Sequence, residues 1–166
     1  MSRRSVIGIL LVLGMPAGGA AAQAPTFTVK MMTPETALSA AQAALKKCRA
    51  QGYQVAVAVV DRSGLTQVLL RDRFAGPHTP DMAVAKAWTA VTLRTNTTDL
   101  ARESQAGRPM SGIRQRPGIA AVGGGLMIEG GGSLLGGIGV SGAPGGDRDD
   151  QCAKAGIDAI DASINF

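Results

Sequence analysis

The chain has 166 residues, of which 45% are hydrophobic and 17% charged, and its formal net charge is +5. This length predicts a single domain, and the balance of apolar and charged residues excludes a disordered tail protein. Only five residues are aromatic and one is a histidine, which argues against a base-stacking surface for single-stranded nucleic acid and against a structural zinc site.

The first 22 residues have the pattern of a secretory signal peptide. Arg3 and Arg4 form a positive start, residues 6–13 are apolar, and the small residues 20–22 fit a cleavage site. The apolar stretch is too short to span a bilayer, so we expect cleavage, a mature domain of residues 23–166, and a periplasmic or secreted location. Loss of Arg3 and Arg4 lowers the net charge from +5 to +3. The mature chain has no basic cluster, so neither nucleic-acid binding nor membrane spanning is expected of it.

Export changes the interpretation of the two cysteines. Cys48 and Cys152 form an even pair in an oxidising compartment, and we predict a disulfide that closes a loop of about 100 residues. A redox-active thiol and a metal ligand are the alternatives. The two cysteines are far apart in sequence and lack the spacing of a redox motif, so neither alternative gains support.

The mature chain begins with a predicted helix between Thr33, which can cap it, and Gly52, which ends it. The following segment is apolar on both faces and predicts a central strand, which a turn joins to an antiparallel partner. A threonine followed by a proline and an acidic residue starts the second helix at Thr79. The elements predicted after Gly52 are strands at 54–60 and 65–71, helices at 79–96 and 98–105, strands at 119–122, 126–129 and 134–140, and a final helix from about 147.

This order of elements predicts an α+β domain with an antiparallel sheet of about five strands. No internal repeat or linker divides the chain, so a single domain is the simplest arrangement. In the second helix, the spacing of Val84, Trp88, Val91 and Thr95 predicts one packed face. Lys86 lies on a different face of the same helix.

Residues 137–142 match the glycine pattern of dinucleotide-binding loops. A dinucleotide-binding fold needs a further parallel strand after the next helix, and the chain ends at Phe166. We therefore interpret the pattern as coincidental. A site where backbone amides bind an anion is the weaker alternative.

Four residues are the candidates for binding a cofactor. His78 precedes the second helix and is either an exposed loop residue or an axial haem ligand or acid/base group. Met82, one turn later, is a second ligand candidate or core filler. Lys86 and Arg116 are either solvated or hold an anionic group such as a propionate. An enzymatic alternative uses Asp61, His78 and Lys86 as acid/base groups.

Four segments of the chain resemble the GlcG/HbpS family of small haem-binding proteins. They are VAVAVVDRSG at 55–64, AVAKAWTA at 83–90, VGGG at 122–125, and GGIGVSGAPGGDRDDQCAKAGIDAI at 136–160. The last segment is the most specific, because it joins a glycine-rich strand, a loop and a helix start in one order. The resemblance spans about residues 32–160.

The resemblance implies a profilin-like or PAS-like α+β fold and homo-oligomers of up to eight subunits. It also implies an exported haem-binding protein in haem or iron handling, or in redox sensing with a partner sensor kinase. In this interpretation His78 is the metal ligand, and the chain is a binding protein rather than an enzyme. The alternative is an accessory or enzyme-like protein of a hydroxyacid, glycolate or corrinoid pathway that uses no haem.

Overall fold

The structure is a computed structural model that describes residues 24–165, so the predicted signal peptide lies outside the described residues. Its elements follow in chain order. They are α1 (Pro34–Ala50), β1 (Ala56–Asp61), β2 (Thr66–Arg71), α2 (Thr79–Leu93), α3 (Thr97–Glu103), the 3-10 turn η1 (Ser111–Gln115), β3 (Gly125–Gly130), β4 (Ser133–Ser141) and α4 (Gly146–Ile164).

The four strands form one sheet in the order β2-β1-β4-β3, and all neighbouring strands are antiparallel. The predicted α+β class, the antiparallel sheet and the central place of β1 are therefore confirmed. The sheet has four strands rather than about five, because residues 119–122 form no strand. The Ala120 amide instead donates to the Thr89 hydroxyl of α2 at 2.9 Å, which ties this segment to a helix.

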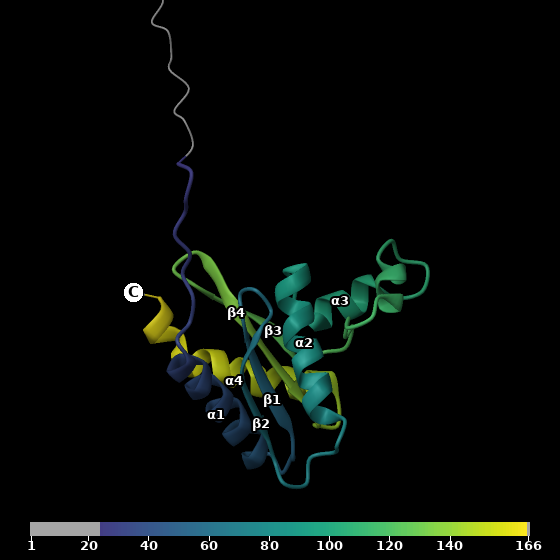
Figure 1. Cartoon of the computed structure of the whole chain (residues 1–166). Helices are drawn as coiled ribbons and strands as arrows, with labels where there is room; N and C mark the ends of the chain where they lie inside the picture. The colour runs from purple at the N-terminus through teal and green to yellow at the C-terminus, as the bar shows by residue number, and fades with distance from the viewer. Residues whose placement is uncertain (1–23, 166) are drawn as a thin grey trace, which may run out of the picture.

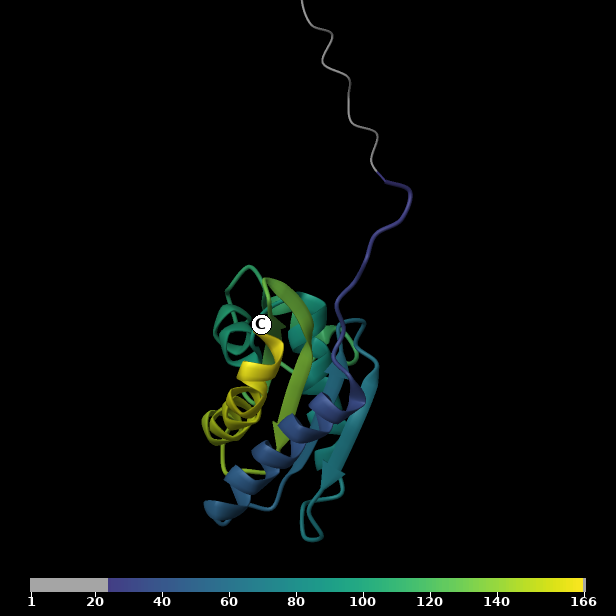
Figure 2. The ribbon, with the colours of Figure 1, turned by 90° about the vertical axis from the view of Figure 1, so that its left-hand side faces the viewer.

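The sheet lies between two helical layers (Figures 1 and 2). Helices α1 and α4 pack side by side on one face, and α2 covers the other. The period-two alternation of the strands divides the core accordingly. Val57 and Val59 of β1 face α1 and α4, while Ala56 and Ala58 face α2.

Small residues bring α2 unusually close to the sheet. A Cβ atom on Gly137 would lie 2.8 Å from the Ala87 carbonyl oxygen, and one on Gly139 would overlap the Ala83 carbonyl oxygen. The dinucleotide-like glycine pattern is therefore part of β4, where it makes room for a helix backbone. Consequently small residues dominate the buried side of α2, where Ala83, Ala87 and Ala90 are joined by Thr89 and Val91. Trp88, predicted to lie on the packed face, is only half-buried and lies over Gly64 and Gly118.

The start of α1 is as predicted, since the Thr33 hydroxyl accepts from the Thr36 amide at 3.3 Å. Helix α2 also begins at Thr79, as predicted, with His78 in the cap position and the Thr79 hydroxyl donating to the Gly76 carbonyl at 2.8 Å.

The predicted disulfide is confirmed and joins the last turn of α1 to the first half of α4. Cys48 and Cys152 are both fully buried, and their Cα atoms are 5.5 Å apart. The two helices also pack through alanines of α1 against Gly156, where a Cβ atom would lie 2.7 Å from the Ala40 carbonyl oxygen. Within residues 24–165, no helix has the length and apolar character needed to cross a bilayer.

Candidate functional site

A cavity of about 600 Å³ lies at the end of the sheet where β1 begins and β4 ends. Ala56 pairs there with Ser141, so the start of α2, the loop after β4 and the start of α4 converge at this point. The segment after α1 and the loop between β2 and α2 complete the walls. The side chains that line the cavity belong to Tyr53, Gln54, Phe74, His78, Thr79, Met82, Lys86, Val122, Ser141, Ala143, Pro144 and Asp149.

One face of α2 forms a wall of this cavity. His78, Met82 and Lys86 follow one another at intervals of four residues, which places them on the same face of the helix. His78 and Met82 are exposed near the mouth, whereas Lys86 is buried at the inner end. The structure therefore brings together three of the four candidate binding residues.

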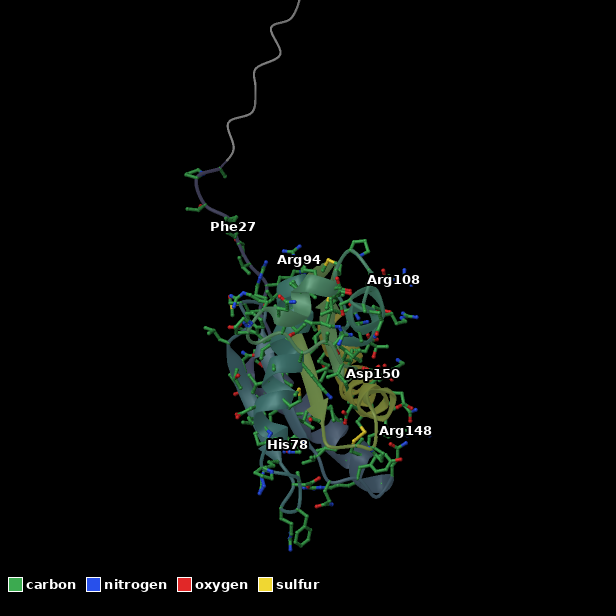
Figure 3. All side chains as sticks on the ribbon, turned by 90° about the vertical axis from the view of Figure 1, so that its right-hand side faces the viewer. Phe27, His78, Arg94, Arg108, Arg148 and Asp150 are labelled. Atoms are coloured by element: carbon green, nitrogen blue, oxygen red, sulfur yellow. A yellow bond between two sulfur atoms is a disulfide. The ribbon has the colours of Figure 1, made fainter. Side chains whose placement is uncertain are left out.

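The His78 ring lies against a residue that has no side chain. A Cβ atom on Gly76 would be 2.8 Å from Cε1 and 3.0 Å from Nδ1 of His78. Glycine at position 76 thus gives the imidazole its place at the mouth. Figure 3 shows His78 at the same end of the molecule as Arg148 of α4, and Arg94 at the far end of α2.

Lys86 forms a buried ion pair with Asp149. Its Nζ atom lies 2.7 Å from Asp149 Oδ2 and donates to the Val140 carbonyl at 2.8 Å, and both residues are almost completely buried. The other carboxylate oxygen of Asp149 accepts from the Ala143 amide at 3.0 Å. The pair therefore links α2, β4, the loop after β4 and α4 at the inner end of the cavity. Lys86 is not solvated, and its ammonium is already bonded.

Burial raises the pKa of Asp149 above its ordinary value of 3.8, because the charged form loses hydration. The nearby Lys86 charge and the hydrogen bonds from Lys86 and Ala143 act in the opposite direction, while Asp150 adds to the rise. Desolvation is the largest of these effects, so Asp149 binds its proton more tightly than an exposed aspartate does, even beside Lys86.

Contacts with α3 and α4 fix the backbone of Gly123 and Gly124, which lead into β3. The Gly124 amide donates to Asp150 Oδ1 at 2.6 Å, and the Thr98 hydroxyl bonds the other carboxylate oxygen. Gly123 crosses Gly146, and a Cβ on either residue would come within 3 Å of the other. This crossing holds Val122 at the edge of the cavity.

Two residues considered for the site lie elsewhere. Arg116 lines a separate hollow of about 470 Å³ beside Trp88. Asp61 ends β1 at the opposite end of the strand from Ala56, and its Oδ1 accepts from the Ser63 and Leu65 amides. The proposed acid/base set of Asp61, His78 and Lys86 does not share one cavity.

Sequence reasoning missed Asp149 as a site residue. Asp149 lies in the first turn of α4 and precedes the buried Cys152 by three residues, so the two lie on the same face of the helix. That spacing was the available signal. Tyr53 and Phe74, two of the few aromatic residues, also line the cavity without having been singled out. Residues 24–165 hold no cluster of three or more histidine, cysteine or acidic side chains that would suit a metal ion.

Solved structures share this fold. A double mutant of Streptomyces reticuli HbpS is 39% identical, with a TM-score of 0.76, over 87% of this chain and 97% of that one. Protein ORFY of Klebsiella pneumoniae is 28% identical with a TM-score of 0.80, over 84% and 97% of the two chains. A structure described as a complex of PduOC with haem is 27% identical with a TM-score of 0.75, over 82% and 100%.

Curated relatives include the corrinoid adenosyltransferase PduO of Salmonella typhimurium, 31% identical over 75% of this chain. The chain spans only 37% of that relative's length. The sequence model of the family described as haem degrading protein HbpS-like matches residues 32–158. That match covers most of the chain and includes every wall of the cavity, so this protein belongs to the HbpS-like family.

Proposed function

We propose that the protein is an exported, small haem-binding protein that holds haem in the cavity beside α2. The observation that carries the proposal is the placing of an accessible imidazole, His78, and a thioether, Met82, one helical turn apart on a wall of a 600 Å³ cavity. Membership of the HbpS-like family and the 27% identity to the chain in a PduOC–haem complex support it.

The residues present fit a haem group. The volume lies within the range of roughly 300–1,000 Å³ that is typical of cofactor cavities. Imidazole and thioether are both common axial ligands of haem iron. Tyr53, Phe74 and Val122 offer apolar surface, and Gly76 and Gly142 leave the mouth free of bulk.

The residues of this chain then have separate tasks. His78 would hold the iron through a ring nitrogen, and Met82 and Phe74 would exclude water from the macrocycle. Lys86 and Asp149 keep the inner wall in place through their mutual ion pair. A bound haem would supply an iron centre that cycles between ferrous and ferric states.

A hemin titration followed by absorption tests the proposal. We expect saturable binding and a Soret band that the His78→Ala variant shifts or weakens, because an axial nitrogen is lost. Thr92→Ala is the matched control, since this exposed residue lies in α2 but outside the cavity. An unchanged spectrum in His78→Ala would remove His78 from the site. Failure of the wild-type protein to bind hemin saturably would overturn the proposal.

Export and self-association form part of the same proposal. The basic, apolar and small residues of the first 22 positions and the disulfide both suit a periplasmic or secreted protein. We expect the mature protein to begin at Gln23, which the intact mass of material from the periplasm or medium measures.

Light scattering tests assembly into oligomers of up to eight subunits. Co-purification from the native source tests for a sensor partner in redox signalling.

Corrinoid binding is the second candidate. It is favoured by the 31% identity to corrinoid adenosyltransferases. The same titration with cobalamin distinguishes the two ligands. Tighter saturation by cobalamin than by hemin would favour the corrinoid assignment, and so place the chain in a corrinoid pathway without haem.

A further inference from the structure

The loop between β2 and α2 places an arginine and a phenylalanine together beside the mouth of the cavity. Phe74 lines the cavity, yet it is 78% exposed. The guanidinium carbon of Arg73 lies 5.9 Å from the centre of the Phe74 ring, which is within the range of a cation–π contact. A flat apolar ligand in the cavity would therefore meet the ring and have a positive charge next to it.

The rest of the loop is fixed by bonds that leave the Arg73 charge unpaired. The acid of the loop, Asp72, is buried and is bound by Arg49, whose Nε atom donates to Asp72 Oδ1 at 2.7 Å. Arg71 donates to the Ala75 carbonyl at 3.1 Å, which holds the turn. Among the described residues, Arg73 takes part in no ion pair.

The interior of the cavity, by contrast, offers no free cation for a carboxylate. The lysine that lines it, Lys86, already bonds Asp149 and the Val140 carbonyl. Arg148 of α4, at the same end of the molecule (Figure 3), lies 3.5 Å from Asp147, so that pair adds little net charge. Consider a ligand with a flat apolar body and carboxylates. Its apolar body would bind inside the cavity, and its carboxylates would lie beside the loop, near Arg73.

We infer that Arg73 binds a carboxylate of the ligand at the mouth while Phe74 covers the ring system, so that this pair selects amphiphilic, acid-bearing macrocycles. The inference rests on the proposed function, in which the carboxylate is a haem propionate. Lys86 and Arg116 then have no part in binding the propionates. The contact is a surface ion pair, and its energy is expected to be modest and salt-dependent.

Titrations with hemin and with its dimethyl ester, in the same detergent-containing buffer, test the inference. Arg73→Leu should weaken hemin binding about two- to five-fold, as an exposed ion pair implies. It should leave binding of the dimethyl ester unchanged, because the ester has no carboxylate to pair. Raised salt should weaken hemin binding by the wild type more than by Arg73→Leu. The matched control is Arg108→Leu, since Arg108 is exposed and lies at the other end of the molecule from His78 (Figure 3).

The outcomes separate this inference from the proposed function. If the wild type binds hemin and Arg73→Leu binds it equally well, the Arg73 inference is wrong and the haem assignment stands. An equal loss for hemin and its ester would also overturn the inference, because Arg73 would then act on cavity shape rather than on charge. If the wild type binds neither compound, both proposals fail. Phe74→Leu should weaken binding of both compounds, because the ring covers the macrocycle in either case.

Discussion

Two opposing effects act on the pKa of Asp149: burial disfavours its charged form, and the Lys86 ammonium favours it. Burial is the larger, so the pKa of Asp149 is higher in the folded chain than in the unfolded one. The native state therefore holds this proton more tightly. It follows that the contribution of Asp149 to the free energy of unfolding is greatest at low pH and falls as the pH rises from about 3.8 through the raised pKa.

Asp149→Asn should remove this pH dependence, because an amide does not titrate. We expect the unfolding free energy of the wild type, minus that of Asp149→Asn, to fall across this pH interval and to be constant above it. Urea unfolding at a series of pH values measures the difference. Asp158→Asn is the control, since Asp158 forms an exposed pair with Lys154 and should show little effect. A difference that rises with pH would mean that Lys86 outweighs burial.

For single residues, the sequence predicts where a side chain lies along its helix better than which groups surround that side chain. Helical spacing placed His78 and Met82 one turn apart, and the structure has both at the cavity. The burial of Lys86 was not predictable from α2 alone, because the partner that permits it comes from α4 and the carbonyl that it bonds comes from β4. A charge becomes acceptable inside a protein only when distant segments supply its bonds.

Among the elements, α2 carries the site residues, and the glycines of β4 set the distance between α2 and the sheet. Gly139→Ala should destabilise the protein by roughly 1–3 kcal/mol, because the new methyl group would overlap the Ala83 carbonyl and push the helix outward. Displacement of α2 should also weaken hemin binding. Thermal unfolding and the titration measure the two effects. Gly112→Ala is the control, since a Cβ there meets nothing within 4 Å. Stability equal to the wild type in Gly139→Ala would show that α2 tolerates the shift.

Helices and strands were predictable where residues close in sequence determine the local conformation. The Thr33 cap was of this kind and is confirmed, and the doubly apolar strand predicted at 54–60 is present as β1 with bounds of Ala56–Asp61. The predicted strand at 119–122 was wrong, because the Ala120 amide donates to the Thr89 hydroxyl of α2 rather than to a neighbouring strand. The packed face of α2 was predicted only in part, because Val91 is buried but Trp88 is half-buried. Ala83, Ala87 and Val91 lie over the glycines of β4, and this close approach depends on a distant segment.

For the whole molecule, the disulfide contributes stability through the unfolded state. The Cys48→Ala/Cys152→Ala double variant should lose about 4 kcal/mol of unfolding free energy, since the bridge closes a loop of about 100 residues. Denaturant unfolding of the oxidised wild type and the variant measures this loss. The double variant should still fold, because alanines of α1 continue to pack against Gly156. A loss well under 1 kcal/mol would mean that the unfolded chain is already compact.

The bridge also limits how far the chain can be drawn out by force. The two cysteines are 104 residues apart, and the whole sheet and the cavity walls of α2 lie between them. Pulled by its ends in a single-molecule experiment, the oxidised chain lengthens only through its terminal segments. Breaking the bond with a thiol reductant would release roughly 350 Å of further contour length at about 3.4 Å per residue. The part of the molecule that binds is thus mechanically shielded from tension applied at its ends.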